Sequence, residues 1–570
     1  MQRHKDLSKG MIDMHSSPIG KAWWKERAVY QIYPRSFFDS NGDGVGDLNG
    51  ITRKLDYIAS LGVGAVWLNP VYDSPNDDMG YDIRNYEGIM REFGTMSDFD
   101  ALLEGLHARG LKLIMDLVVN HTSDEHAWFV ESRRSRDNPY RDYYIWRNGV
   151  GGAEPNNWAS FFTPSAWTYD ETTDQWYLHL FSEKQPDLNW QNSAVRAEIC
   201  AMMNRWFDKG VDGFRMDVIN LIAKADGLPD GTGPASPEGY VFAPERFANQ
   251  PRVHEYLRKI RRACFDGRDC MCVGETPFSD SRTGFTYVDP KNHELDMVFS
   301  FDLMDIDSGK SGKWEIVPWD LARMKAIIEN WQTTLARGWN SLFWSNHDQP
   351  RPVSRFGSTS SEALRVRSAK MLGTAMYLLR GTPFIYQGEE LGMTNVPFRG
   401  AEDLRDIESL NFFRLASARG EAEAAWNAIL KKSRDNARAP MQWNASANGG
   451  FSAGEPWLMV NSNYRIINVE AAERNPNSVL HFYRRLLRLR AGSETLIYGD
   501  FAMIERAHPQ VFAYTRALGD ERFFILCNMS AEPAVLTVPY AGKCVLRNMD
   551  GEIQEDALEP FEARVLFTGD

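Results

Sequence analysis

Gly213-Phe214-Arg215-Met216-Asp217-Val218 is a short, mostly apolar run that reaches an acidic residue near its end. Seven further runs have the length and apolar character of strands that are buried on both faces. Helical patterns lie between them, for example over residues 193–207 and 362–379. Eight strands that alternate with helices predict an α/β fold, a parallel (β/α)8 TIM barrel, whose chemistry lies at the carboxyl ends of the strands. The seven other runs are 28–33, 65–68, 112–118, 271–274, 297–301, 341–344 and 383–386.

Two stretches interrupt this alternation. Residues 122–186 are rich in Trp, Tyr, Asn and Gly, and a loop of that length predicts an inserted subdomain after the third strand. From about residue 501 the pattern predicts short strands and a C-terminal antiparallel β-domain. We therefore expect a first part of the catalytic barrel at 18–121, the inserted subdomain at 122–186, the second part of the barrel at 187–498 and the β-domain at 499–570. The short strands are expected at 511–515, 522–527, 534–538 and 564–567.

The composition is that of a globular chain and disfavours several partners. Of the 570 residues, 43% are hydrophobic and 25% are charged, and 64 basic against 77 acidic residues leave a net charge of −13. This charge disfavours nucleic acids and anionic membranes, and six cysteines are too few for a disulfide scaffold. No run is long and apolar enough for a membrane helix or a signal peptide. We expect a cytoplasmic monomer, with no readable role for residues 1–17 or for the loop 223–251.

Acidic residues follow three of the predicted strands. Asp217 ends the run quoted first, Glu275 follows Val273-Gly274, and Asp348 follows Ser345-Asn346-His347. Carboxylates that converge on one barrel end have pKa values that are pushed apart, which provides a protonated acid beside an ionised nucleophile. Glycosidic cleavage needs that pair, and Arg215 would point to the same face as Asp217 and keep it ionised. The simpler alternative is that these residues only cap helices.

Four segments resemble, in order and spacing, the signature regions of the α-amylase superfamily, glycoside hydrolase family 13. They are 116–121, 213–220, 274–276 and 345–348, and residues 185–189 resemble a fifth region of its oligo-1,6-glucosidase and α-glucosidase subfamily. The resemblance implies that Asp217 is the nucleophile, Glu275 the general acid/base and Asp348 the transition-state stabiliser. It implies retention of anomeric configuration, with two carboxylates about 5–5.5 Å apart. The residues that would support the sugar in the cleaving subsite are His121, His347, Arg215 and Asp116.

The same resemblance implies an exo-acting site. In Asp78-Met79-Gly80-Tyr81-Asp82, residues Asp78, Tyr81 and Asp82 would grip the terminal non-reducing glucose. Arg438, with Arg434 as a second candidate, would reach the same sugar. Without the resemblance, core packing of Tyr81 and a surface ion pair of Arg438 would be the simpler explanations. The partner would be a small oligosaccharide, from which one glucose is removed at a time.

Val218, directly after the proposed nucleophile, bears on the linkage. Members of the resembled family that act on α-1,6 links carry Val here, whereas α-1,4-specific members carry Ala or Thr. One methyl group is worth about 1–3 kcal/mol in a pocket, so it biases specificity without excluding a substrate. The alternative is that Val is simply a good strand residue. The resemblance thus implies a retaining α-glucosidase that acts on isomaltose and isomalto-oligosaccharides.

Four other functions remain open. A sucrose isomerase would carry an arginine-rich loop, but residues 301–308 contain no arginine. A trehalose-6-phosphate hydrolase would need cations near the leaving sugar, for which Lys310, Lys313 and Arg282 are candidates. An α-1,4-preferring α-glucosidase would share the whole mechanism. A non-catalytic transporter partner would lack the three acids that this chain retains.

An acidic, glycine-containing loop follows the first predicted strand. Oxygen-bearing residues at alternating positions resemble the start of an EF-hand loop, but no Glu stands at the twelfth position. The family resemblance implies a structural Ca²⁺ or Mg²⁺ and no organic cofactor. The alternative is a turn rich in Asp and Asn that binds no metal. The implied ligands are Asp39, Asn41, Asp43, the Val45 carbonyl and Asp47.

Overall fold

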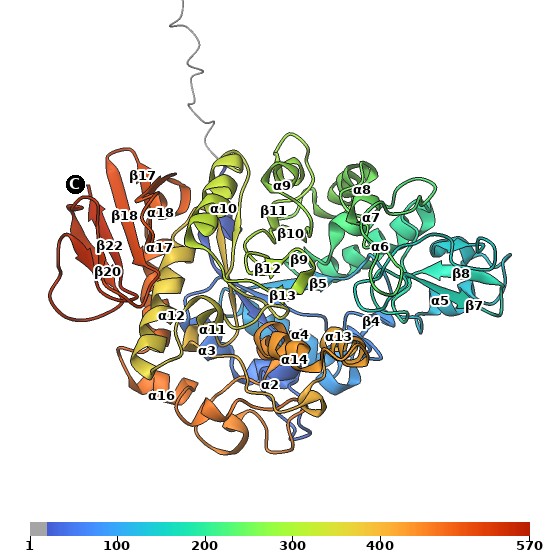
Figure 1. Cartoon of the computed structure of the whole chain (residues 1–570), viewed down its shortest axis with the longest axis horizontal. Helices are drawn as coiled ribbons and strands as arrows, with labels where there is room; N and C mark the ends of the chain where they lie inside the picture. Colours follow the sequence, from blue (N-terminus) through green and yellow to red (C-terminus); the bar gives the residue numbers. More distant parts are fainter. Residues whose placement is uncertain (1–19, 570) are drawn as a thin grey trace, which may run out of the picture.

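Eight parallel strands form the barrel in the computed structural model, which describes residues 20–569 (Figure 1). Their order is β11-β10-β9-β5-β2-β1-β15-β14. A parallel bridge between Val298 and Asn340 brings the two ends of this sheet together. The predicted barrel is confirmed, whereas residues 1–17 lie outside the described part of the chain. The bounds are β1 (Val29–Ile32), β2 (Ala65–Leu68), β5 (Lys112–Leu117), β9 (Gly213–Met216), β10 (Met271–Glu275), β11 (Met297–Phe299), β14 (Ser341–Leu342) and β15 (Thr382–Tyr386).

Three of these strands end two residues earlier than the sequence pattern predicts. β9 ends at Met216, β11 at Phe299 and β14 at Leu342. Apolar patterns report burial rather than ladder hydrogen bonds, and Val218 and Trp344 stay buried beyond the ends of their strands. The chain therefore leaves the ladder just where the acidic residues are expected, at the carboxyl end of the barrel.

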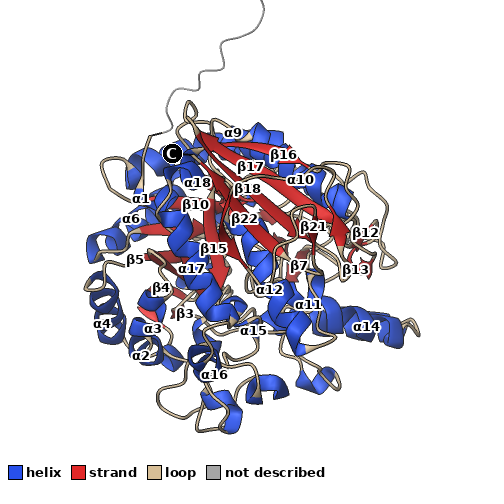
Figure 2. Cartoon of the chain, turned by 90° about the vertical axis from the view of Figure 1, so that its left-hand side faces the viewer, coloured by secondary structure: helices blue, strands red, loops and turns tan. Residues whose placement is uncertain are grey.

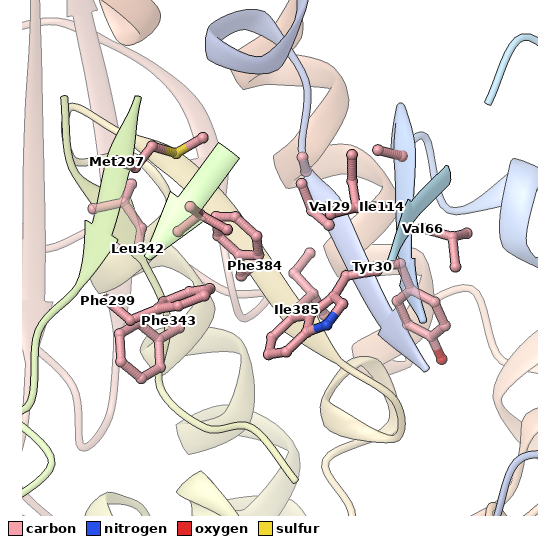
Figure 3. Packing of buried hydrophobic residues seen from close by; sticks show 14 of the residues in the cluster. Val29, Tyr30, Val66, Ile114, Met297, Phe299, Leu342, Phe343, Phe384 and Ile385 are labelled. Atoms are coloured by element: carbon pink, nitrogen blue, oxygen red, sulfur yellow. The ribbon is translucent and has the colours of Figure 1, made fainter. Parts of the chain in front are cut away.

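The barrel interior is packed with large apolar side chains. Figure 3 shows Phe299, Phe343 and Phe384 lying close together between their strands. The rings of Phe299 and Phe384 are 4.7 Å apart, and Trp67 stacks on Phe299 at 5.5 Å. A filled interior leaves only the ends of the barrel for chemistry.

Helices cover the outside of the barrel and begin at well-formed caps. α4 (Met96–His107) begins with a capping box in which Thr95 and Asp98 satisfy each other's backbone N–H groups. α6 (Ser193–Lys209) is capped by Asn192 and ends at Gly210, whose φ of 112° lies in the left-handed region. The helices α8 (Arg252–Ile260), α10 (Leu321–Thr334) and α12 (Glu362–Tyr377) cover later strands.

Several segments extend from the carboxyl end of the barrel. The inserted region contains a small antiparallel sheet in the order β6-β8-β7, and it projects from the barrel at the right of Figure 1. Bridges between His121 and Asp187 and between Tyr144 and Leu188 fasten it at its base. Its elements are α5 (Ala127–Ser132), β6 (Trp146–Arg147), β7 (Trp167–Asp170) and β8 (Gln175–Leu178). Nearby lie the hairpin β12 (Ser308–Gly309) and β13 (Gly312–Ile316) and the helices α13 (Ile407–Ala418), α14 (Ala422–Lys432) and α15 (Asp435–Arg438).

The C-terminal domain is an antiparallel sheet in the order β16-β17-β18-β22-β20, which faces the viewer in Figure 2. The strand predicted at 534–538 shortens to β19 (Ala534–Val535), which pairs with β21 (Ala557–Leu558) outside the main sheet. Pro533 and Pro539 flank it and cannot donate to a ladder. The main strands are β16 (Asp500–Ile504), β17 (Val511–Leu518), β18 (Glu521–Asn528), β20 (Lys543–Arg547) and β22 (Ala563–Thr568).

Among the described residues, no helix has both the length and the apolar character needed to cross a membrane. We keep the four domain boundaries given above as a proposal.

Candidate active site

Arg215 gathers the carboxylates at the carboxyl ends of the strands. This buried side chain in β9 donates through Nη1 to Oδ1 of Asp217 at 2.6 Å and to Oδ1 of Asp116 at 2.8 Å. Its Nη2 lies 2.6 Å from Oε2 of Glu275, the last residue of β10. One guanidinium therefore binds three carboxylates from three strands, which are the charge-assisted contacts that hold such groups close together. Neither Asp217 nor Glu275 caps a helix.

Burial and mutual repulsion raise the pKa of both central acids. Burial is the largest cause for Glu275, and Asp217 and Asp348 add to it against the opposing charge of Arg215, so that its pKa rises to about 8. The pKa of Asp217 is also raised by burial and by Asp116, and although Arg215 and a hydrogen bond with Glu275 lower it, it rises to about 7. Glu275 therefore has the higher pKa of the two and is the better proton donor of the pair.

Val218 forms a strained turn between the two acids. Its φ of 34° and ψ of 41° place a β-branched residue in the left-handed region, which costs on the order of 1–3 kcal/mol. In this turn the Val218 N–H donates to Oε2 of Glu275 at 3.1 Å. Val218 is not part of β9, so the alternative that it serves as a strand residue does not hold. The turn therefore places the N–H of the residue after Asp217 where it binds Glu275.

Asp348, which follows β14, has an ionised carboxylate that is bound by an arginine. Nη2 of Arg438 donates to its Oδ1 at 2.7 Å, and Nε2 of His347 is 3.2 Å from its Oδ2. Burial alone would raise the pKa of Asp348, but the positive charges of Arg438 and Arg434 hold it far below its usual range. Arg438 is 1% exposed, so it is not the surface ion pair of the simpler explanation.

Two histidines and a tyrosine line the same region. The ring of Tyr81 stacks on His347 with centroids 5.2 Å apart, and its hydroxyl donates to Oδ2 of Asp116 at 2.9 Å. Burial lowers the pKa of His347 to about 3 and that of His121 to about 4. Both rings are therefore neutral near pH 7. Nε2 of His347 has no hydrogen-bond partner in the described part of the chain and can bind a sugar hydroxyl, whereas the ring nitrogens of His121 already contact the Tyr81 carbonyl and Asn120.

Asp78 is connected to the rest of the site by Arg434. Nη2 of Arg434 donates to Oδ1 of Asp78 at 2.9 Å, and Nε2 of Gln185 lies 3.3 Å from Oδ2. Nη1 of the same Arg434 lies 3.6 Å from Oδ1 of Asp348. The structure thus brings together the side chains of Asp78, Arg434 and Asp348.

Asp82 does not take the expected place. Its side chain is completely buried, and it accepts hydrogen bonds from the Ser74 hydroxyl and from the backbone N–H groups of Asp77 and Asp78 at 2.9 to 3.0 Å. Both oxygens are committed to the loop, so Asp82 shapes the segment that presents Asp78 and is not a sugar ligand. The motif 78–82 contains two aspartates, and its sequence does not indicate which of them is bonded to the loop.

The three cationic candidates for a phosphate site differ in their surroundings. Lys313 is 2.6 Å from Oε2 of Glu408, whose carboxylate also lies 3.6 Å from Nε of Arg434. Lys310 and Arg282 are exposed.

The turn after β1 holds the five expected metal ligands, but they bond to their own backbone. Asp39 accepts three backbone N–H groups of residues 41–44 and the hydroxyl of Ser452. Asn41 and Asp43 each close a further turn at 2.9 Å. Within residues 20–569, no three His, Cys, Asp or Glu side chains are grouped so that they could hold a metal. The all-oxygen donor set fits Ca²⁺ or Mg²⁺ in kind, and the arrangement is that of an Asp- and Asn-rich turn.

Comparison with known proteins places the chain in a family. Residues 31–499 match the α-amylase catalytic domain, and residues 501–559 match the maltogenic amylase C-terminal domain. The oligo-1,6-glucosidase of Parageobacillus thermoglucosidasius is 54% identical over 96% of this chain and 99% of its own, and that of Bacillus cereus is 51% identical over the same shares.

Solved structures agree with this assignment. The trehalose-6-phosphate hydrolase of Bacillus licheniformis has a TM-score of 0.91 at 43% identity, and the trehalulose synthase MutB of Pseudomonas mesoacidophila has a TM-score of 0.91 at 42%. Each comparison covers 96% of this chain and the whole of the other. With a barrel that ends in arginine-linked carboxylates and a family match over most of its length, the chain belongs to the α-amylase family of glycoside hydrolases.

Proposed function

We propose that this chain is an exo-acting, retaining oligo-1,6-glucosidase, which releases glucose from the non-reducing end of isomaltose and isomalto-oligosaccharides. The observation that carries the proposal is the binding of Asp217 and Glu275 to one guanidinium, with Asp348 opposite. Relatives that share about half of their residues with this chain are named oligo-1,6-glucosidases. Val218 after the nucleophile agrees with that linkage.

In the first half of the reaction, Asp217 attacks the anomeric carbon while Glu275 protonates the glycosidic oxygen. The proton of Glu275, the group with the higher pKa, serves the leaving sugar, and the charge of Arg215 favours the ionised form of Asp217 that attacks. A covalent glucosyl-aspartate forms, and the shortened sugar departs. In the second half Glu275, now ionised, takes a proton from water, which hydrolyses the intermediate with net retention.

The remaining groups bind the sugar that carries the developing charge. Asp348 stays ionised and stabilises the oxocarbenium-like transition state, helped by its short contact with Arg438. Nη1 of Arg438 is buried and has no hydrogen-bond partner in the described part of the chain, so it can donate to a sugar hydroxyl. Asp78, Tyr81, His121 and His347 would bind further hydroxyls of the same glucose.

Trehalose 6-phosphate is the second candidate substrate, because a relative that is 46% identical is named trehalose-6-phosphate hydrolase. Its phosphate would need cations beside the leaving sugar, and of the three candidates Lys313 is paired with Glu408, whereas Lys310 and Arg282 are exposed. The test is kcat/KM for glucose release from isomaltose, maltose, sucrose and trehalose 6-phosphate with one enzyme preparation. We expect isomaltose to have the highest value. A preference for any other substrate would overturn the linkage assignment, and turnover of none would overturn the function.

Replacing Val218→Ala shifts linkage preference toward maltose. The side chain is 8% exposed and packs beside the nucleophile, so losing its methyl groups widens the wall next to the leaving sugar. We expect the isomaltose-to-maltose ratio of kcat/KM to fall about tenfold. Val241→Ala removes the same atoms from the same apolar cluster and serves as the control. An unchanged ratio in Val218→Ala would contradict a role for this residue in specificity.

We also propose that the turn at residues 39–47 binds a structural Ca²⁺ or Mg²⁺ at low affinity, away from the chemistry. Calcium at millimolar concentration should then raise Tm by about 2 °C over the chelated protein, since a ligand that binds only the folded state stabilises it. Asp43→Ala should abolish this response, because it removes one carboxylate ligand. Equal melting curves with calcium and with chelator would refute the site.

We further propose that the protein is located in the cytoplasm. All six cysteines are free thiols, which fits that reducing compartment. A monomer is proposed as well, and its mass in solution would be 65.0 kDa.

A further inference from the structure

Asp406 is a buried carboxylate for which the mechanism above has no use. It stands directly before α13, is completely buried, and accepts N–H groups of Glu408 and Ser409 at 3.2 Å as the cap of that helix. Asp406 also binds an arginine. Nε of Arg434 donates to its Oδ1 at 2.7 Å, and Nη2 lies 2.6 Å from the same oxygen.

Arg434 connects this cap to the sugar site. From the other side of its guanidinium, Nη2 donates to Asp78 at 2.9 Å and Nη1 lies 3.6 Å from Asp348. The plane of the guanidinium is also held by the ring of Phe162, 5.0 Å away. Arg434 is only 6% exposed and lies within 4 Å of four carboxylates, the fourth being Glu408 at 3.6 Å, so its position depends on the balance of their charges.

Further hydrogen bonds join the segments that carry Asp406 and Arg434. Oδ2 of Asp435, the residue after Arg434, accepts the N–H groups of Arg405 and Asp406 at 2.7 and 3.0 Å. The hydroxyls of Ser409 and Ser433 are 2.9 Å apart. The start of α13 and the segment that carries Arg434 are therefore tied together by main-chain and side-chain bonds.

We propose that Asp406 is a positioning residue for substrate binding, which fixes the Arg434 guanidinium and, through its bond to Asp78, holds the Asp78 carboxylate in place for the hydroxyls of the terminal sugar. The inference rests on the proposed function. Without the charge of Asp406, the guanidinium loses its shortest contact, and Asp78 loses the fixed partner that orients it for the substrate. Arg434 pairs with neither Asp217 nor Glu275, so we expect the effect to fall mainly on substrate binding.

Asp406→Asn separates this role from helix capping, since Asn is as good an N-cap as Asp but carries no charge. We expect KM for isomaltose to rise about tenfold, the size of one lost charged hydrogen bond, with kcat within about threefold and Tm near wild type. Asp403→Asn is the matched control, because it removes an exposed ion pair with Arg399 just before the same helix. An unchanged KM, or a loss of Tm and kcat at constant KM, would overturn the proposal.

A double-mutant cycle tests whether Asp406 acts through Arg434. Arg434→Gln alone should raise KM, and adding Asp406→Asn to it should raise KM no further. Additive increases would show an independent role and overturn the inference. Wild type that does not cleave isomaltose would instead overturn the proposed function, whereas active wild type with a normal Asp406→Asn variant overturns only this step.

Discussion

Asp217→Asn should abolish hydrolysis of isomaltose, lowering kcat by at least about 10⁴-fold, as removal of a covalent nucleophile does elsewhere. Asn has almost the same shape and still offers an oxygen to Nη1 of Arg215, which also keeps Asp116 and Glu275 as partners. The fold should therefore persist, with Tm near wild type.

The measurement is kcat from glucose release, with circular dichroism and thermal melting as the check on folding. Asp208→Asn, on the exposed face of α6, makes the same chemical change away from the site and should leave kcat unchanged. A variant of Asp217 that keeps more than about a hundredth of wild-type kcat would contradict the nucleophile assignment.

Glu275→Gln should slow cleavage of isomaltose by about 10²- to 10⁴-fold, because the leaving sugar then departs without a proton. With a p-nitrophenyl α-glucoside the loss in the first, glucosyl-transfer step should be much smaller, since nitrophenolate leaves unprotonated. A burst of nitrophenolate would report that step separately from the slow hydrolysis of the intermediate. Equal losses of the transfer rate on both substrates would contradict an acid role for Glu275.

The pH dependence of wild type makes the same point. Glu275 must be protonated to act as the acid, and burial raises its pKa to about 8. kcat/KM therefore falls as pH rises through about 8, as Glu275 loses its proton, and it also falls on the acid side, where Asp217, with its pKa raised to about 7, becomes protonated. Glu275→Gln should lose this alkaline limb. An alkaline limb that persists in the variant would assign it to another group.

The sequence predicts the barrel well because each strand is an apolar run with both faces buried, and such runs leave a signal that does not depend on partners. It also predicts the acids, because Asp217, Glu275 and Asp348 each follow a strand and the barrel brings strand ends together. The resemblance to a known family adds Asp78, Tyr81 and the histidines. In each case the local sequence pattern determines where the residue lies in the fold.

Other features depend on contacts between distant segments, which no local pattern records. The burial of Asp82 arises from the path of residues 74–78, and the strain at Val218 arises from a turn that ends β9 early. Asp406 was missed because its partner Arg434 lies 28 residues away and on another helix-bearing segment. Only the folded chain shows that these two buried charges meet beside Asp78.

The most direct test of the account is ¹H NMR of a p-nitrophenyl α-glucoside during the first minutes of hydrolysis by wild type, before mutarotation equilibrates the anomers. A double displacement through Asp217 predicts that the single glucose released appears first as the α-anomer. Initial appearance of β-glucose from that substrate would contradict the covalent mechanism, and the absence of cleavage would contradict the proposed function itself.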